Sequence, residues 1–173
     1  GFFIDDLYQK DCDRIIVFKV KGKDELGDSS YKELIVEIMG RHSNIVLVDE
    51  AKGTIIDCIK HVPNSVNRYR TLLPGQKYIW PPEQEKRNPF SVKEQDVLEL
   101  IDFSGENIDR QIVDRFSGIS PAFAKEVLER SENQDSYSVA KTFLSLVSSI
   151  RRGEISPALH RNKKDIFYLF PLK

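Results

Sequence analysis

The sequence has few of the residues that metal and disulfide chemistry needs. It contains two cysteines, Cys12 and Cys58, and three histidines in 173 residues. The cysteines fit no metal-ligand spacing, and although two cysteines could in principle pair, two free thiols on or beside strands in a reducing compartment are favoured. The sequence therefore predicts neither a metal site nor a cofactor.

Long apolar runs and catalytic motifs are also missing. No run approaches the roughly 18 apolar residues that cross a bilayer. The GxSxG, P-loop, HExxH and glycine-rich dinucleotide motifs are absent. Carboxylates are many but scattered, and His42 has no nucleophile at a compelling spacing. We therefore expect a binding protein that is not an enzyme and has no membrane partner.

The chain has almost no net charge, −1 overall, but the charge is unevenly distributed. Residues 1–53 carry −3, 54–93 carry +4, 94–135 carry −7 and 136–173 carry +5. A Debye length of about 10 Å hides distant charge, so a local basic zone can bind phosphates on a neutral protein. The composition as a whole indicates no nucleic-acid partner, but the basic zones 54–93 and 136–173 are compatible with one.

The first half of the chain has the pattern of β-strands. Expected strands cover residues 1–9, 14–20, 31–39, 44–48 and 54–62. Their short connections favour an antiparallel meander. At its centre, residues 37–50 form two apolar strands around the polar turn 40–43, in which Gly40 permits the positive φ of a tight connection.

The second half has a different texture. Residues 63–90 are punctuated by prolines yet apolar, which predicts an ordered irregular segment packed across the sheet. Helical periodicity starts at Ser91, which forms an expected capping box with Glu94. Further helices are expected near 107–116, from Pro121 with Ser120 as cap, and at 139–151, followed by a late strand at 166–170 that could return to the sheet. The prediction is an α+β fold with a β part at 1–90 and a helical part at 91–173.

An antiparallel meander would gather basic side chains at one end of the sheet, because alternate strand ends meet there. That end collects Arg14, Arg41, His42, Lys60 and His61, with Arg68 and Arg70 just downstream, against Asp11 and Asp13. Arginines bind phosphates, and Tyr69 and Trp80 could stack on bases. This edge is a candidate RNA-facing surface. The alternative is that these side chains pair with nearby carboxylates and bind nothing.

A second candidate site is the break between two expected helices at Gly118, Ile119 and Ser120. The amides of a new helix N-terminus can hold a phosphate. The turn resembles that of a helix–hairpin–helix motif, but Ser120 stands where a second glycine is usual, and the flanking helices are acidic. A simple packing corner is the favoured interpretation.

Three motifs carry a family resemblance along nearly the whole chain. They are EIMGRHSNIVLVD (37–49), YRTLLPGQ (69–76) and RQIVDRFSGISP (110–121). The chain resembles the latter part of the NFACT-N domain, the family of RqcH and of the fibronectin-binding proteins FbpA and PavA. The resemblance also implies that the first part of that domain, and later family regions, lie outside this sequence.

The resemblance implies a fold similar to the N-terminal region of formamidopyrimidine-DNA glycosylase: a half β-sandwich followed by a helix–two-turn–helix unit. It implies a cytoplasmic ribosome-associated quality-control factor that binds the obstructed large ribosomal subunit and alanyl-tRNA and promotes alanine tailing of stalled chains. The Asp-Arg pair that the family needs for tRNA recruitment matches Asp13 and Arg14. No catalytic residue is implied, because elongation would use the ribosome's own peptidyl-transferase centre.

Two other functional classes stay open at this stage. One is a surface adhesin that binds fibronectin or fibrinogen, with a pool of the protein at the cell surface. The other is a glycosylase-like enzyme acting on nucleic acid, although the catalytic N-terminal residue of such enzymes would lie outside this sequence. Cosedimentation with ribosomes, nuclease-insensitive affinity for fibronectin and cleavage of damaged DNA separate the three.

Overall fold

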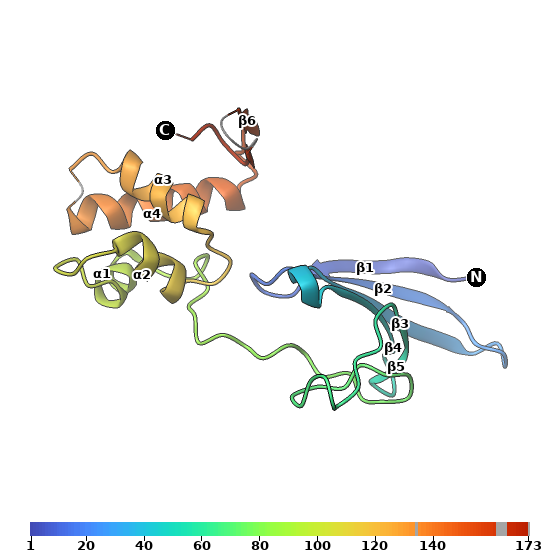
Figure 1. Cartoon of the computed structure of the whole chain (residues 1–173). Coiled ribbons are helices and arrows are strands. Elements are labelled where there is room, and N and C mark those ends of the chain that lie inside the picture. Colours follow the sequence, from blue (N-terminus) through green and yellow to red (C-terminus); the bar gives the residue numbers. More distant parts are fainter. Residues whose placement is uncertain (134, 162–165, 173) are drawn as a thin grey trace. The chain divides into compact units, whose positions relative to one another are not determined.

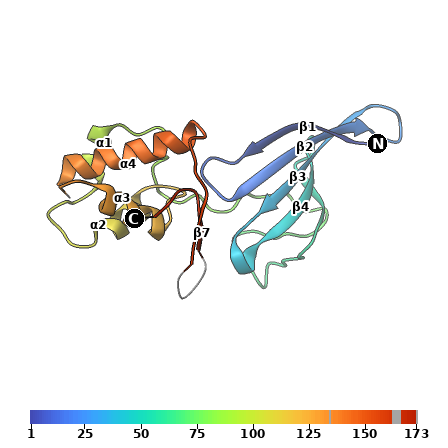
Figure 2. The ribbon, with the colours of Figure 1, turned by 90° about the horizontal axis from the view of Figure 1, so that it is seen from above.

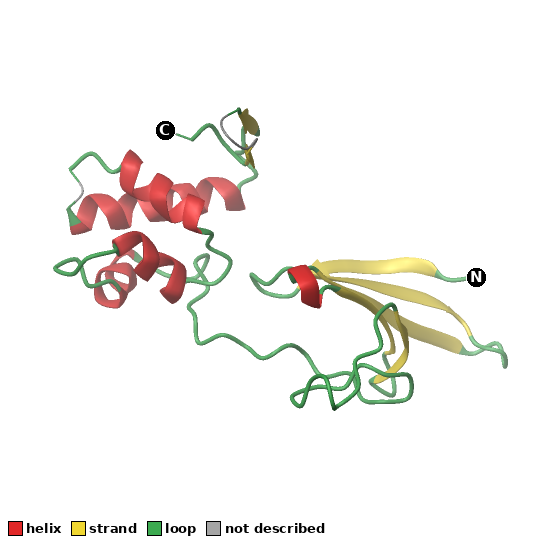
Figure 3. Cartoon of the chain, in the orientation of Figure 1, coloured by secondary structure: helices red, strands yellow, loops and turns green. Residues whose placement is uncertain are grey.

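A computed structural model describes residues 1–133, 135–161 and 166–172 (Figure 1). The chain divides into two compact units, Gly1–Glu83 and Gln84–Lys173, each with its own apolar core. The five long strands belong to the first unit and the four α-helices to the second (Figure 3). The sequence pattern predicts the boundary between the β part and the helical part after residue 90.

The first unit is built on one antiparallel sheet with the strand order β1-β2-β3-β4-β5. Figure 2 shows the first four of these strands side by side. The strands are β1 (Phe3–Gln9), β2 (Ile15–Lys23), β3 (Ser29–Glu37), β4 (Asn44–Asp49) and β5 (Thr54–Cys58). A single turn of 3₁₀ helix, η1 (Gly40–His42), joins β3 to β4. Each strand pairs with its neighbour in sequence, which confirms the expected meander.

One face of this sheet forms the core of the first unit. Side chains alternate between the two faces of a strand, and the inward set is almost fully buried: Ile15, Val17, Ile35, Val46, Val48 and Ile55. The proline-rich segment crosses this face. It buries Leu72 and packs Tyr78 and Trp80 against the core. The segment is therefore irregular and packed on the sheet as far as Trp80, as its sequence predicted, whereas residues 84–90 belong to the second unit.

The opposite face of the sheet is apolar as well. Its side chains are half-buried: Ile16, Phe18, Leu34, Val36, Ile45 and Leu47. A shallow hollow of about 230 Å³ lies between Leu34, Ile45, Leu47 and Ile59. A sheet with two apolar faces is typical of one layer of a sandwich, which agrees with the expected half β-sandwich.

Strand β5 ends at Cys58, and its predicted continuation to Val62 is wrong. One more backbone bond follows, from the Ile59 amide to the Ile45 carbonyl at 3.0 Å, and the side chain of Asn44 then replaces the ladder. Its Nδ2 donates to the Lys60 carbonyl, and its Oδ1 accepts from the Lys60 amide, both at 2.9 Å. The chain is thereby held beside β4 while it turns away from the sheet, so the position of Lys60 is fixed without a strand.

The second unit contains four helices and a short hairpin: α1 (Glu94–Leu100), α2 (Ile108–Arg115), α3 (Pro121–Arg130), α4 (Ser136–Arg151), β6 (Ala158–His160) and β7 (Ile166–Tyr168). The Ser120 hydroxyl caps α3 by accepting from the Phe123 amide at 3.2 Å, as expected. The cap predicted for Ser91 is wrong. That hydroxyl bonds the Asn88 carbonyl, while Asp96 accepts from the Lys93 amide at the start of α1.

Three phenylalanines form the centre of the helical core. Phe116 and Phe143 have ring centroids 4.6 Å apart, and Phe123 packs edge-on against Phe143 at 6.2 Å. The late strand was expected as a possible return to the main sheet. It pairs instead with β6 in a separate two-stranded sheet. The Ser156 amide, just before β6, extends this pairing by donating to the Leu169 carbonyl at 2.9 Å.

The packing around Phe143 makes it the most sensitive position of the helical core. We expect Phe143→Ala to lower the free energy of unfolding by about 3–5 kcal/mol, because the truncation leaves a cavity among rings that cannot collapse. Tyr137→Ala is the matched control on the same helix. Tyr137 is 65% exposed, so its loss should stay within about 0.5 kcal/mol. Urea unfolding followed by circular dichroism measures both, and equal effects would contradict this account of the core.

Candidate nucleic-acid interface

The strand register brings the basic segments to one end of the sheet. Ile15 at the start of β2 lies opposite Glu37 at the end of β3, and Glu37 lies opposite Asn44 at the start of β4. The Ile38 amide donates to the Arg14 carbonyl at 2.8 Å. The side chains of Arg14, Arg41, His42, Lys60, His61 and Arg68 are all exposed. We call this set the basic edge.

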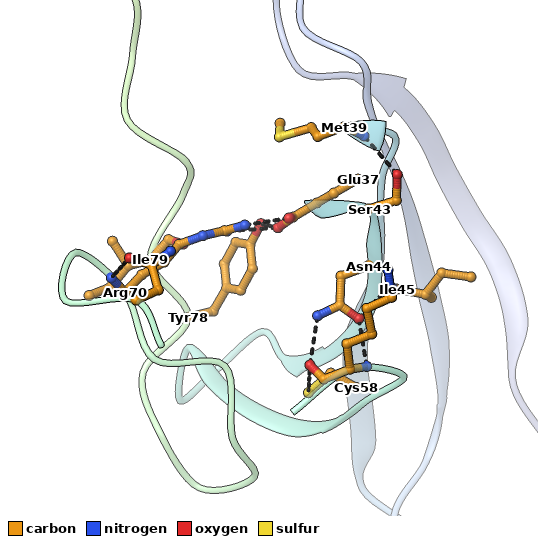
Figure 4. Close-up of polar contacts among 11 residues, drawn as sticks. Glu37, Met39, Ser43, Asn44, Ile45, Cys58, Arg70, Tyr78 and Ile79 are labelled. Carbon is orange, nitrogen blue, oxygen red and sulfur yellow. Dashed lines mark hydrogen bonds and ion pairs between the residues drawn. The ribbon is translucent and has the colours of Figure 1, made fainter. Parts of the chain in front are cut away.

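The connection between β3 and β4 is stiffened from inside. Gly40 has a φ of 58°, in the region that favours glycine. The Ser43 hydroxyl accepts from the Met39 amide at 2.9 Å (Figure 4). At the tip, Arg41 Nε donates to His42 Nε2 at 3.0 Å. The guanidinium of Arg41 and the imidazole of His42 therefore contact each other on a rigid support, with the imidazole as the acceptor.

Asp13 and Arg14 lie in the turn that leads into β2. Asp13 is half-buried and Arg14 is exposed. The turn is closed by the Asp13 amide, which donates to the Lys10 carbonyl at 3.0 Å, and by Gln9 Nε2, which donates to the Asp13 carbonyl at 2.7 Å. In the described part of the chain, neither side chain has an ion-pair or hydrogen-bond partner, and the two are not paired with each other. Both are available to a ligand.

Lys60 and His61 differ in their partners, because Lys60 bonds uncharged groups whereas His61 lies against a carboxylate. Lys60 is held by Asn44, and its Nζ donates to the Arg41 carbonyl at 3.4 Å. His61 Nε2 lies 3.2 Å from Asp57 Oδ1. The Cys58 amide, first of all, and then His61 lower the pKa of Asp57. The alternative of local pairing therefore applies to His61, whereas Lys60 keeps its charge unpaired by any described carboxylate.

Arg70 does not belong to the basic edge, and its prediction as an RNA-facing residue is wrong. Its guanidinium forms a buried ion pair with Glu37 (Figure 4), in which the two side chains are 7% and 0% exposed. Arg70 also donates to Glu37 Oε1 at 2.8 Å and to the Ile79 carbonyl at 3.1 Å. The Tyr78 hydroxyl completes the cluster by donating to Glu37 Oε1 at 2.7 Å. Trp80, predicted to stack on bases, packs edge-on against Tyr78.

Burial and the contacts with Glu37 shift the pKa values of Arg70 and Tyr78. Burial alone would lower the pKa of Arg70, but the bonds to Glu37 outweigh it and the pKa is raised. Burial, followed by the charge of Glu37, raises the pKa of the Tyr78 hydroxyl. Sequence reasoning missed Glu37 as a partner. Its position two residues after the inward-facing Ile35 was the available signal, because alternate residues of a strand share a face.

The turn between α2 and α3 forms where the sequence predicts it, but the Ser120 hydroxyl already has hydrogen-bond partners. Gly118 has a φ of 71° and is exposed, as is Ser120, whereas Ile119 packs on the helical core. The Ser120 hydroxyl caps α3 and lies 3.2 Å from the Tyr168 hydroxyl. These contacts favour the packing corner. Phosphate binding at Gly118, Ile119 and Ser120 stays a prediction.

The described residues offer neither a membrane-spanning helix nor a cluster of metal ligands. None of the described helices is long and apolar enough to cross a membrane. Within residues 1–133, 135–161 and 166–172, no group of three or more His, Cys, Asp or Glu side chains could hold a metal ion. The opposite end of the sheet carries mixed charge, with Lys19 paired to Glu50 at 2.8 Å.

Comparison with known proteins places the chain in a family. The model of the NFACT N-terminal and middle domains matches residues 1–173. The chain belongs to the NFACT-N family. It is 43% identical over 173 residues to the Rqc2 homolog RqcH of Bacillus subtilis (strain 168), and 44% identical over 127 residues to that of Streptococcus suis. It spans 30% and 23% of the length of these two relatives.

Solved structures support the fold. The fibrinogen binding protein from Staphylococcus aureus superimposes with a TM-score of 0.87 at 36% identity, over 99% of this chain and 63% of the other. The N-terminal part of the fibronectin/fibrinogen-binding protein from Streptococcus suis gives a TM-score of 0.80 at 36% identity, over 99% and 60%. These two structures confirm the α+β fold class.

The buried cluster predicts that substitution of Arg70 strongly lowers the stability of the fold. Arg70→Met would leave the Glu37 carboxylate buried without its cation, which costs about 3–5 kcal/mol of unfolding free energy. Arg68→Met, the exposed neighbour, is the control and should change stability by less than about 0.5 kcal/mol. Chemical denaturation at neutral pH measures both. A stable Arg70→Met protein would show that Glu37 does not depend on the ion pair.

Proposed function

We propose that this chain is the RNA-binding module of a ribosome-associated quality-control factor. In this function it binds the obstructed large ribosomal subunit and alanyl-tRNA, and it promotes C-terminal alanine tailing of stalled chains in the cytoplasm. The observation that carries the proposal is the match to an RqcH protein along the whole chain, at 43% identity. We assign tRNA recruitment to Asp13 and Arg14, because these residues match the Asp-Arg pair that the family resemblance implies.

The geometry of the basic edge supports this proposal. Arg14 is exposed and unpaired among the described residues, so its guanidinium can take two phosphate oxygens. Asp13 forms no described pair with Arg14 that would orient it. Its carboxylate instead accepts from a base or from a ribose hydroxyl, since a carboxylate does not favour a phosphate. Arg41 and Lys60 add positive charge alongside, and His42 adds an exposed imidazole.

The proposed role needs binding and positioning from this chain, not covalent chemistry. Peptide bonds would form in the ribosome's own peptidyl-transferase centre, with the module holding the tRNA that delivers alanine. The side chains at the edge suit that task, because guanidinium, imidazole and ammonium groups are hydrogen-bond donors.

Binding of an extracellular-matrix protein is the second candidate. It is favoured by one observation, the structural similarity to proteins described as fibrinogen binding and fibronectin/fibrinogen-binding. Affinity for immobilised fibronectin that survives nuclease treatment would support it. Affinity that disappears with nuclease would assign the retention to bound RNA.

The Asp-Arg pair provides the direct test. We expect Asp13→Ala with Arg14→Ala to abolish recovery of alanyl-tRNA with the intact protein, a loss of at least about tenfold, because both proposed RNA contacts disappear. Sequencing and quantifying the co-purified RNA measures it. Circular dichroism should be unchanged, since neither side chain has a described packing role.

The matched control is Lys23→Ala with Asp28→Ala. It also removes one exposed base and one exposed acid, but at the opposite end of β2. It should leave tRNA recovery and cosedimentation with large subunits unchanged. Full tRNA recovery with the Asp13 and Arg14 variant would sink the assignment of this pair, and no tRNA with the unaltered protein would sink the proposed function.

A further inference from the structure

The segment after β5 carries no negative charge over a long stretch. Residues 58–82 contain no aspartate or glutamate, whereas they contain Lys60, His61, Arg68, Arg70 and Lys77. Glu37 neutralises Arg70 from β3, and Lys77 Nζ donates to the Lys52 carbonyl. Arg68 is left exposed and without a described carboxylate partner. This surface therefore suits an anionic ligand.

Within this segment, residues 63–70 form a loop that is closed at its base. The Val62 amide donates to the Leu72 carbonyl at 2.9 Å, and the Leu72 amide donates back at 2.8 Å. The loop begins at the basic edge, because the preceding Lys60 is bonded to Asn44 and to the Arg41 carbonyl. Its exposed residues thus extend the surface that contains Arg41.

The interior of the loop is held by short-range hydrogen bonds. The amides of Val66 and Asn67 both donate to the Pro63 carbonyl, at 2.9 and 3.1 Å. Asn67 Oδ1 then accepts from the Tyr69 amide at 2.9 Å and from the Arg70 amide at 3.4 Å. The next side chain, Arg70, is anchored to Glu37 in the core. The backbone of Tyr69 is therefore fixed from both sides.

Tyr69 itself points outward from this rigid support. It is 57% exposed, and its ring and hydroxyl have no described partner, in contrast to Tyr78 and Trp80, which pack inward. An exposed aromatic ring on a stiff backbone loses little conformational freedom when a flat group stacks on it. Arg68, the residue before Tyr69 in the chain, adds an exposed guanidinium.

We propose that Tyr69 is a stacking platform for one unpaired RNA base, with Arg68 contacting a neighbouring phosphate. The inference rests on the proposed RNA-binding function and adds to it a second contact and a substrate feature, a nucleotide outside a duplex. The absence of carboxylates favours RNA over a protein partner, because a basic surface with an aromatic ring matches phosphates and bases together.

The test measures binding of a fluorescent, unmodified alanine-tRNA transcript to the intact protein. Tyr69→Ala should weaken binding about 5- to 150-fold, the range for losing one stacked base. Tyr69→Phe should bind within about twofold of the unaltered protein, because phenylalanine keeps the stacking face. Tyr137→Ala, which removes an equally exposed tyrosine from α4, should have no effect.

Two further measurements keep the proposal falsifiable. Ultraviolet crosslinking of the unaltered protein should map to the peptide that contains Tyr69, whether or not the alanine variant folds. A perfectly paired RNA of the same length should show no difference between the unaltered protein and Tyr69→Ala, because it offers no unpaired base.

The outcomes separate this inference from the proposed function. A protein that does not bind the tRNA at all overturns both. Tight binding with an unaffected Tyr69→Ala variant overturns only the stacking platform. Equal losses in the phenylalanine and alanine variants would assign the contact to the hydroxyl and overturn the proposal. If Tyr69→Ala weakens nuclease-insensitive binding to immobilised fibronectin but leaves tRNA binding unchanged, the surface belongs to a protein partner, which overturns the proposal as well.

Discussion

The buried ion pair between Glu37 and Arg70 is the contact on which the shape of the first unit depends. Burying two charges is costly, and it is tolerated only when their hydrogen-bonding groups are satisfied. Here Glu37 accepts from both Arg70 and Tyr78, and Arg70 also reaches the Ile79 carbonyl. The carboxylate sits at the end of β3, so it fastens an irregular segment to the sheet at one defined place.

That attachment links the core to the surface. Arg70 is buried while its neighbours Arg68 and Tyr69 are exposed, so a single anchored residue determines where the loop presents its cation and its ring. Asn44 acts in the same way at the start of the loop, by bonding both backbone groups of Lys60. Two polar side chains inside the unit thus position much of the basic edge that the proposed RNA contact uses.

Strand pattern and charge were readable from the residues because they depend on local chemistry. Alternation of apolar side chains predicted the meander, and the meander predicted that Arg14, Arg41 and Lys60 would share one end. The Ser120 cap was predictable for the same reason, since a capping hydroxyl acts within three residues. The capping residue of α1 was not, because the Ser91 hydroxyl bonds the Asn88 carbonyl of the preceding turn and the helix starts only after Lys93.

The sequence by itself determined the strand order, the polarity of the sheet and the family. The tertiary structure alone decided which arginine is exposed to a ligand and which is buried in an ion pair. Arg68 and Arg70 are chemically identical and two residues apart, and nothing local distinguishes them. Arg70 is buried because Glu37, 33 residues earlier, lies opposite it across the folded unit, and a contact over that distance exists only once the sheet has formed.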